Sequence, residues 1–199
     1  MDLQLQQGDA LVVVDVQRDL VGGSIAVPGA EQVVPVLDRY IACFRGMGLP
    51  IFATRDWHPA DHASFSERGG AWPAHCVAGT PGAEFAPGLT LGVDAIVVSR
   101  GTSRDADSGS AFEGTELDEM LKRAGAVRLF VGGLATDYGV LATVRDALDK
   151  GYRVFLLADA IRAADLKPGD GAFAVRTMLR AGAELVHRPE VEPHIQAHG

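Results

Sequence analysis

The segment DWHPADH places Asp56, His58 and His62 within seven residues, and His75 follows in the same loop. Two imidazoles and a carboxylate suit Zn²⁺, Fe²⁺ or Mn²⁺ and leave positions open for water or substrate. In a regular strand, residues two apart point to the same side, so Asp56 and His58 would face one space. Pro59 would then end the strand. The alternative is that these are ordinary histidines of a surface loop.

Asp15 directly follows the apolar run LVVV, which places it at the end of an expected central strand. Burial of a carboxylate there would raise its pKa and suit it to general acid or base catalysis. Arg100 also follows an apolar run. If it lies nearby, it would hold that carboxylate ionised or bind an anionic ligand. An aspartate bonded to loop amides and a solvated arginine are the alternatives.

The segment GGLATDYGV, from Gly132 to Val140, follows another apolar run. Its two leading glycines allow close approach of the backbone, and Thr136 or Asp137 would cap the helix that follows. Backbone N–H groups at that helix start would face the site and stabilise a developing oxyanion. A plain turn from strand to helix is the alternative.

The elements that would position these groups are short runs of Val, Ile and Leu without clean alternation, which is typical of parallel strands covered on both faces. Helix-length segments with apolar spacing near 3.6 lie between them, and the first of these helices is expected to open at Pro28 and to end at Gly46 or Gly48. The alternation predicts a parallel α/β sheet with right-handed crossovers. The expected strands are Ala10–Val14, Pro50–Thr54, Ala95–Val98, Val127–Val131, Val154–Ala158 and Ala183–Val186.

Ligands of an open parallel sheet bind beyond the carboxyl ends of its strands, so polar residues should cluster after each apolar run. They do, at Asp15 and Gln17, at Arg55, Asp56 and His58, at Ser99 and Arg100, and at Thr136 and Asp137. The loop 55–92 interrupts the alternation of strands and helices and contains both tryptophans. A loop of this length is usually functional or disordered, and its aromatic content argues against disorder.

The chain of 199 residues predicts one domain, assigned to residues 1–190, with a flexible tail at 191–199. Its net charge is 18 − 26 = −8 without a basic cluster, so we expect no nucleic-acid partner. The apolar runs are far shorter than the roughly 20 residues that span a bilayer. Met1–Gly8 lacks the features of a signal peptide, and two cysteines make no disulfide framework. We therefore expect a cytoplasmic protein without a membrane partner.

Together these motifs resemble those of nicotinamidases in the isochorismatase-like hydrolase superfamily. The likeness covers nearly the whole chain, through VVVDVQRDL, DWHPADHASF, WPAHCV, RGT, SAFEGT, GLATDYGV and the DAI that starts at Asp159. It implies a Rossmann-like three-layer αβα fold with a six-stranded, mainly parallel sheet, and commonly a homo-oligomer. It also implies a divalent metal ion (Zn, Fe or Mn) held by Asp56, His58 and His75, with His62 as an additional candidate ligand.

In this family the metal helps to hold the pyridine nitrogen of nicotinamide. The resemblance therefore implies a small-molecule substrate or ligand that is nicotinamide-like or another small cyclic compound. Trp72 would match an aromatic wall of the pocket, and Gln17, Leu134 and Tyr138 complete the expected pocket. The backbone N–H groups of Ala135 and of residue 139 would form the oxyanion site.

The family's catalytic triad is Asp–Lys–Cys, and this chain matches it only in part. Asp15 matches the aspartate, but Arg100 stands at the lysine position and Gly139 at the cysteine position. Glycine offers no nucleophile, so the covalent acyl-enzyme route is lost. A guanidinium stays charged and does not share protons as a lysine does. Gly109 and Leu20 also stand where the family usually carries aromatic residues.

Three functions fit these departures. The first, which the sequence favours, is a hydrolase that uses Asp15 without a covalent intermediate. Some isochorismatases that act on vinyl ethers carry glycine at this position and use the aspartate as a proton donor. The second is a non-catalytic relative that binds a ligand or metal, although the intact metal motif weighs against decay. The third is an ordinary nicotinamidase, converting nicotinamide to nicotinate and ammonia, with its cysteine engineered away; the second change at Arg100 weighs against it.

Overall fold

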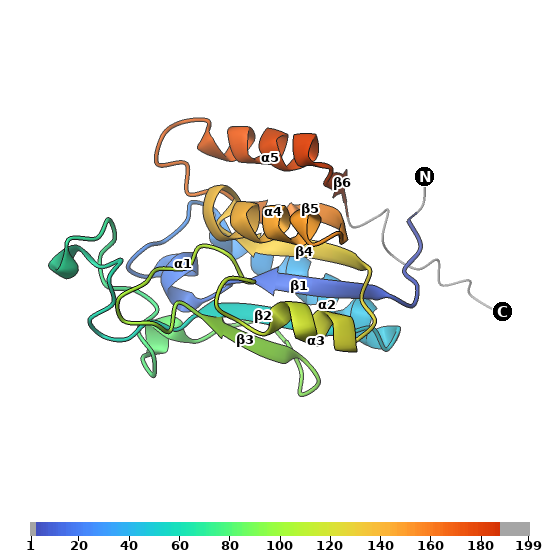
Figure 1. Ribbon diagram of the computed structural model, residues 1–199, viewed down its shortest axis with the longest axis horizontal. Coiled ribbons are helices and arrows are strands. Elements are labelled where there is room, and N and C mark those ends of the chain that lie inside the picture. Colours follow the sequence, from blue (N-terminus) through green and yellow to red (C-terminus); the bar gives the residue numbers. More distant parts are fainter. Residues whose placement is uncertain (1–2, 188–199) are drawn as a thin grey trace.

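The apolar runs form one six-stranded parallel sheet with the order β3-β2-β1-β4-β5-β6 (Figure 1). This computed structural model describes residues 3–187, so the expected tail at 191–199 lies outside the described residues. The strands are β1 (Asp9–Val14), β2 (Ile51–Asp56), β3 (Ile96–Arg100), β4 (Arg128–Leu134), β5 (Arg153–Arg162) and β6 (Glu184–Val186).

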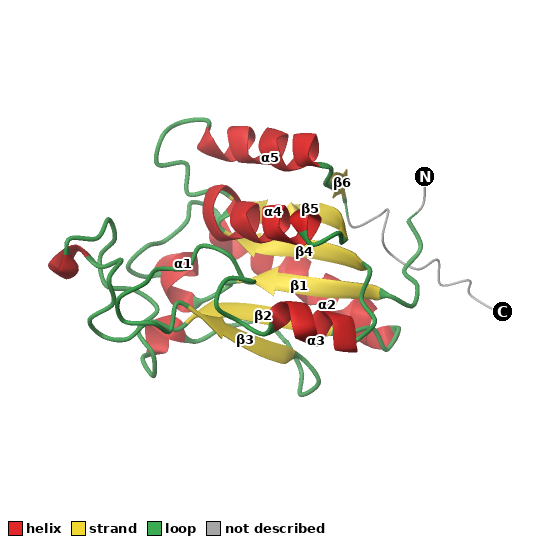
Figure 2. Ribbon diagram, in the orientation of Figure 1, coloured by secondary structure: helices red, strands yellow, loops and turns green. Residues whose placement is uncertain are grey.

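Helices cover both faces of the sheet, which confirms the three-layer αβα architecture (Figure 2). Helices α1 (Arg18–Gly22) and α2 (Val33–Gly46) pack on one face. The other face carries α3 (Leu117–Arg123), α4 (Leu141–Asp149) and α5 (Asp170–Ala181). No helix among residues 3–187 is long and apolar enough to cross a membrane.

Each face of the sheet has its own hydrophobic core, because both faces are covered. On the α2 face, the ring of Phe130 stacks on Phe155 at 4.8 Å between centroids and meets Phe44 edge-on at 5.3 Å. On the other face, Leu117 and Val144 are fully buried against the strands. Burial of each such side chain stabilises the fold by about 1.5–3 kcal/mol, so the two cores hold the sheet rigid beneath its carboxyl edge.

The predicted boundaries of three elements were wrong. Helix α2 begins at Val33 and not at Pro28, because Gly29 takes a left-handed conformation with φ of 72° that interrupts the helix. Strands β2 and β3 extend beyond the apolar runs, since Asp56 still pairs with Arg100 across the two strands. The polar residues expected after these strands are therefore part of the sheet, which fixes their direction.

The long connection between β2 and β3 lies over the carboxyl edge of the sheet (Figure 1). It contains the short 3₁₀ turns Ser66–Arg68 and Pro81–Ala83 and is tied down by isolated bridges. One bridge joins His58 to Val77, and another joins Phe65 to Trp72. These bridges hold the loop in a defined conformation.

Candidate metal and acid site

A cavity of about 350 Å³ opens at the carboxyl edge of the sheet, where ligands of parallel sheets bind. Its wall includes all of the predicted site residues except Gln17 and His62. The residues brought together are Asp15, Asp56, His58, Trp72, His75, Arg100, Leu134, Ala135, Tyr138 and Gly139. The ends of four strands and the long loop thus meet around one space.

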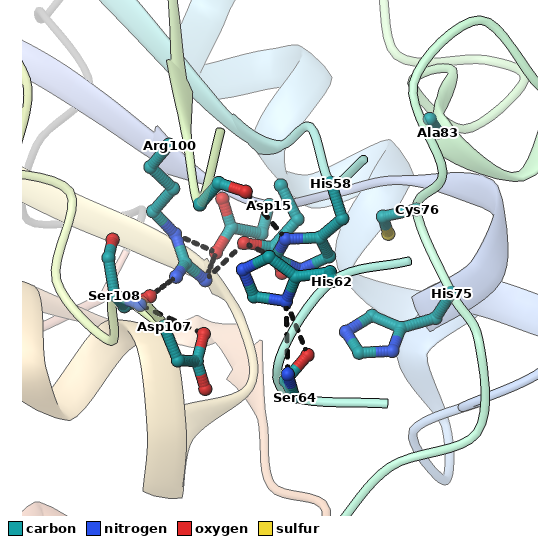
Figure 3. A network of polar contacts seen from close by, with 12 residues as sticks. Asp15, His58, His62, Ser64, His75, Cys76, Ala83, Arg100, Asp107 and Ser108 are labelled. Atoms are coloured by element: carbon teal, nitrogen blue, oxygen red, sulfur yellow. Dashed lines mark hydrogen bonds and ion pairs between the residues drawn. The ribbon is translucent and has the colours of Figure 1, made fainter. Parts of the chain in front are cut away.

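Asp56, His58 and His75 form what we call the metal triad. One ligand atom from each residue lies within 4.8 Å of the others, and all three side chains are buried. Asp56 ends β2, and His58 follows two residues later, so both point into the same space, as the spacing predicts. Figure 3 shows His75 approaching from the long loop on the other side.

The protein contacts of the metal triad fit a divalent cation. The Nδ1 atom of His58 donates to the Gly101 carbonyl at 2.9 Å, and Nδ1 of His75 donates to the Pro73 carbonyl at 2.8 Å. These bonds fix the tautomer that leaves Nε2 as a lone-pair donor, which is the usual second shell of a metal-binding imidazole. The Asp56 Oδ1 atom is buried and lies 3.0 Å from Arg100 Nη2, but among the described residues no contact to it has hydrogen-bond geometry. A carboxylate and two imidazoles of this kind suit Zn²⁺, Fe²⁺ or Mn²⁺.

His62 and Gln17 lie behind the cavity wall. The ring of His62 stacks on His58 at 4.1 Å, its Nδ1 lies 2.7 Å from the Ser64 Oγ and its Nε2 lies 3.2 Å from the Ala106 carbonyl. Both of its nitrogens therefore have protein partners. Gln17 accepts a hydrogen bond from the Asp56 N–H and donates to the Asp56 carbonyl, so it positions the metal triad and does not line the pocket.

Charges in the metal triad favour an ionised carboxylate. Burial acts to raise the pKa of Asp56, but Arg100, His58 and His75 outweigh it and hold that pKa below its ordinary value. Burial lowers the pKa of His75, which keeps its imidazole neutral. Burial also acts to lower the pKa of His58, but the neighbouring Asp56 carboxylate raises it overall. A bound cation would compete with that proton.

Asp15, Arg100 and Gly139 form a second group, which we call the acid centre. Arg100 Nη2 lies 2.5 Å and its Nε lies 3.1 Å from Asp15 Oδ2, and Thr54 donates to Asp15 Oδ1 at 2.7 Å. The same guanidinium lies 3.0 Å from Asp56 Oδ1 and donates to the Ser108 carbonyl. Figure 3 shows Arg100 between Asp15 and Ser108. Arg100 thus links the acid centre to the metal triad.

The Arg100 guanidinium forms ion pairs with two buried carboxylates, Asp15 and Asp56, whose pKa values shift in opposite directions. Burial raises the pKa of Asp15, and the negative charge of Asp56 adds to that effect, despite the opposing charge of Arg100. The pKa of Asp56 moves down. Opposite shifts in neighbouring carboxylates are the usual sign that one acts as an acid and the other as an anion.

Gly139 lies in the π-helical turn Thr136–Val140, directly beside Asp15. A Cβ atom at this position would stand 2.9 Å from Asp15 Oδ2 and 3.2 Å from the Leu134 carbonyl oxygen. The φ of Gly139 is not positive, so the backbone does not require glycine here. Glycine at 139 therefore provides room for the carboxylate.

Neither cysteine replaces the missing nucleophile. Cys76 follows His75 and is buried, and burial raises the pKa of its thiol, which disfavours the reactive thiolate. Its backbone N–H donates to Asp19 at 2.8 Å, which anchors the loop that carries His75. Cys43 lies on α2, away from the cavity wall.

Trp72 and Tyr138 form an aromatic side of the cavity. Their rings meet edge-on with centroids 5.2 Å apart, and Tyr138 remains 43% exposed. The carboxylate of Asp137, the residue before Tyr138 in the same turn, accepts hydrogen bonds from the N–H groups of Ala164 and Asp165. Asp137 therefore holds the segment after β5 against the cavity. The sequence predicted that Thr136 or Asp137 would cap the helix, but no side chain makes that hydrogen bond.

Three site residues escaped the sequence analysis: Thr54, Gly101 and Ser108. Two of them act through backbone carbonyls, which carry no signal of residue type. Thr54 sits inside an apolar strand, and its only clue was a hydroxyl within a fully buried run. Pairing of Thr54 with Asp15 depends on the register of β1 and β2, which a single sequence does not define.

Comparisons with known proteins match the sequence and the fold of this chain. The nicotinamidase of Escherichia coli K12 is 38% identical over 88% of this chain and 93% of its own. A crystal structure of Pyrococcus horikoshii pyrazinamidase in complex with zinc has a TM-score of 0.87 and 45% identity, over 90% of this chain and 99% of that one. The structure of PnC1 from L. infantum with nicotinate has a TM-score of 0.88 and 33% identity, over 96% of this chain and 98% of that one. Residues 9–190 match the isochorismatase domain, and the chain belongs to the isochorismatase family as a nicotinamidase-like hydrolase.

Proposed function

We propose that this chain is a metal-binding hydrolase of small cyclic substrates that works through the Asp15 carboxyl group without a covalent intermediate. Thiol-based hydrolysis of nicotinamide would be impaired in it, because residue 139 has no side chain. Its natural substrate is expected to contain a bond that breaks after protonation, such as the C–O bond of a vinyl ether.

The observation that carries this proposal is the position of Asp15 Oδ2. It lies 2.9 Å from the point where a Cβ atom of residue 139 would stand. The carboxyl group thus borders the space from which the family's thiol would attack. Its raised pKa supports a protonated acid at that point, and Arg100 and Thr54 fix its orientation.

The chemistry balances with water as the only co-reactant. Asp15 donates its proton to the vinyl carbon of the substrate, and the ether carbon becomes an oxocarbenium ion. Water adds to that carbon and returns one proton to the Asp15 carboxylate. The hemiketal then breaks its C–O bond to give a ketone and an alcohol. General acid catalysis of this type contributes about 10²–10⁴-fold to a rate.

The remaining groups would bind and orient the substrate. Asp56, His58 and His75 would hold the divalent ion, which, when bound, supplies a Lewis acid for a ring heteroatom or a carboxylate. Trp72 would contact the ring of the substrate along the aromatic side of the cavity. Backbone N–H groups at Ala135 and Gly139 would stabilise negative charge on an oxygen.

Asp15→Asn tests the role of the acid. Asp15 has φ of 48°, and asparagine tolerates this left-handed conformation, so the fold should persist. We expect hydrolysis of a vinyl ether such as isochorismate to fall by about 10²–10⁴-fold. Asp9→Asn is the matched control, since Asp9 is a buried aspartate at the other end of β1 that pairs with Arg128 at 2.5 Å. It should lower stability and leave kcat intact.

The pH dependence gives a second readout. An acid works only while protonated, so the wild-type rate should fall as the pH rises through the pKa of Asp15. Because burial raises this pKa above 3.8, the fall should come at higher pH than for an ordinary aspartate. Nicotinamide turnover by the wild type at about 1–10³ per second would contradict the proposal, because that rate is ordinary for an enzyme with its nucleophile in place.

A further inference from the structure

A groove beside helix α4 adjoins the cavity. The groove is lined by residues of the segment 109–113 and by one side of α4. The cavity and the groove share three wall residues, Gly109, Ala142 and Arg145, which we call the junction.

Gly109 leaves space at the junction, because it has no side chain. A Cβ atom at Gly109 would meet only Ala142 Cβ, at 3.9 Å, so a side chain there would enter the space between the loop and α4. Gly109 does not have positive φ, so its backbone conformation does not require glycine. The lack of a side chain at residue 109 therefore leaves room between the loop and α4 and is not required by the backbone of the turn.

Arg145 is the free cation at the junction. It is exposed on α4, and no ion pair or hydrogen bond of its side chain occurs within the described residues. The other arginine of the cavity wall, Arg100, is already bound by Asp15 and Asp56. A guanidinium with five unused donors at a cavity mouth is suited to a planar carboxylate.

The acidic side chains of the groove limit what Arg145 can bind. The groove is also lined by Asp146, Asp149 and Glu113, and the Glu113 carboxylate accepts a hydrogen bond from the Gly109 N–H at 3.1 Å. Lys150, a further lining residue, pairs with Asp118 at 3.6 Å. A long polyanion would meet these acidic side chains. A single carboxylate on a short arm would stop at Arg145.

We infer that the substrate of this site carries a short arm that passes Gly109 and ends in a carboxylate bound by Arg145. This inference rests on the proposed function, since it assigns a substrate class to the same cavity. A ring compound larger than nicotinamide would then fit this chain, with the arm passing Gly109 at the junction while the ring stays beside Trp72.

Calorimetric binding to the full chain with added zinc tests the inference without turnover. The probes are N-(carboxymethyl)nicotinamide and its methyl ester, which have the same arm with and without the charge. We expect the acid to bind about fivefold more tightly than the ester, the range of one exposed ion pair. In Arg145→Gln this ratio should fall to about one. The matched control, Arg39→Gln on the outside of α2, should keep the wild-type ratio.

Gly109→Phe gives an independent test of the path. The ring should fill the space at the junction and weaken both arm-bearing probes relative to nicotinamide itself, whatever their charge. Equal affinities of acid and ester in the wild type, an unchanged ratio in Arg145→Gln, or no binding of the acid would each overturn the inference. Because binding alone is measured, loss of hydrolysis in Asp15→Asn leaves this result unaffected, so the two proposals fail separately.

Discussion

The metal triad and the acid centre share one cavity but differ in how closely they keep the pattern of the family that the chain resembles. The metal triad retains the residue types expected for a divalent ion, and each imidazole has its backbone acceptor. The acid centre carries Gly139 and Arg100 at the positions where the resemblance places the family's cysteine and lysine. The two groups are nevertheless joined, because β2 supplies Asp56 to the metal triad and Thr54 to the acid centre, and Arg100 contacts a carboxylate of each.

Among the changes that test the comparison of the metal triad with the acid centre, removal of Asp56 should have the largest effect. Asp56→Ala deletes the one anionic ligand of the triad, so metal content, measured by mass spectrometry, should fall from about one ion per chain to near zero. Asp61→Ala is the control, since this aspartate lies in the same loop, is exposed and pairs with Arg104. Wild-type protein without metal after zinc loading would contradict the assignment.

Introducing the family's cysteine and lysine should convert the acid centre into a thiol-based amidase site. Gly139→Cys together with Arg100→Lys supplies a nucleophile and a group that shares protons, so nicotinamide hydrolysis should rise at least about tenfold above the wild type. Gly139→Cys alone should gain much less, because Arg100 still holds Asp15 Oδ2 against the new side chain. Ammonia release measures both. Equal activity of the single and double variants would show that Arg100 does not constrain Asp15.

A smaller change tests packing alone. Gly139→Ala adds one methyl group 2.9 Å from a carboxylate held by Arg100 and Thr54, so unfolding in urea should show a loss of about 1–3 kcal/mol. In the Arg100→Lys background the loss should shrink, since contacting residues couple. Gly46→Ala in α2 is the matched control: nothing lies within 4 Å of its new methyl group, and it should be neutral or stabilising. A neutral Gly139→Ala would contradict the contact.

The fold was predictable because its central strands, β1, β2, β4 and β5, are largely buried on both faces. Unbroken apolar runs such as Val154–Ala158 mark the sheet without any knowledge of long-range contacts, and β5 indeed spans Arg153–Arg162. The helix α1 was missed because its five residues, RDLVG, are too few to show a periodic pattern. Its position depends on the long loop packed against it.

The metal triad was also predictable: Asp56 and His58 follow from their spacing at a strand end, and the resemblance added His75 as the third ligand. The interior of the acid centre was not. Pairing of Asp56 with Arg100 across β2 and β3 depends on strand register, and Gln17 was placed in the pocket because its polar side chain follows β1. Instead its side-chain amide forms hydrogen bonds with the backbone N–H and carbonyl groups of Asp56. A single sequence gives residue types, whereas these roles come from which backbone groups lie opposite them.

Arg100 is the final residue of β3, which is the outermost strand at one margin of the sheet. Marginal strands detach at lower free energy than central ones, by transient fraying of their hydrogen bonds. Each such excursion would withdraw one cation from two carboxylates at once and leave their repulsion unscreened. The stability of the β2–β3 pairing therefore determines how long Arg100 stays paired with Asp15 and Asp56. Amide hydrogen exchange at residues 97–100 would measure it.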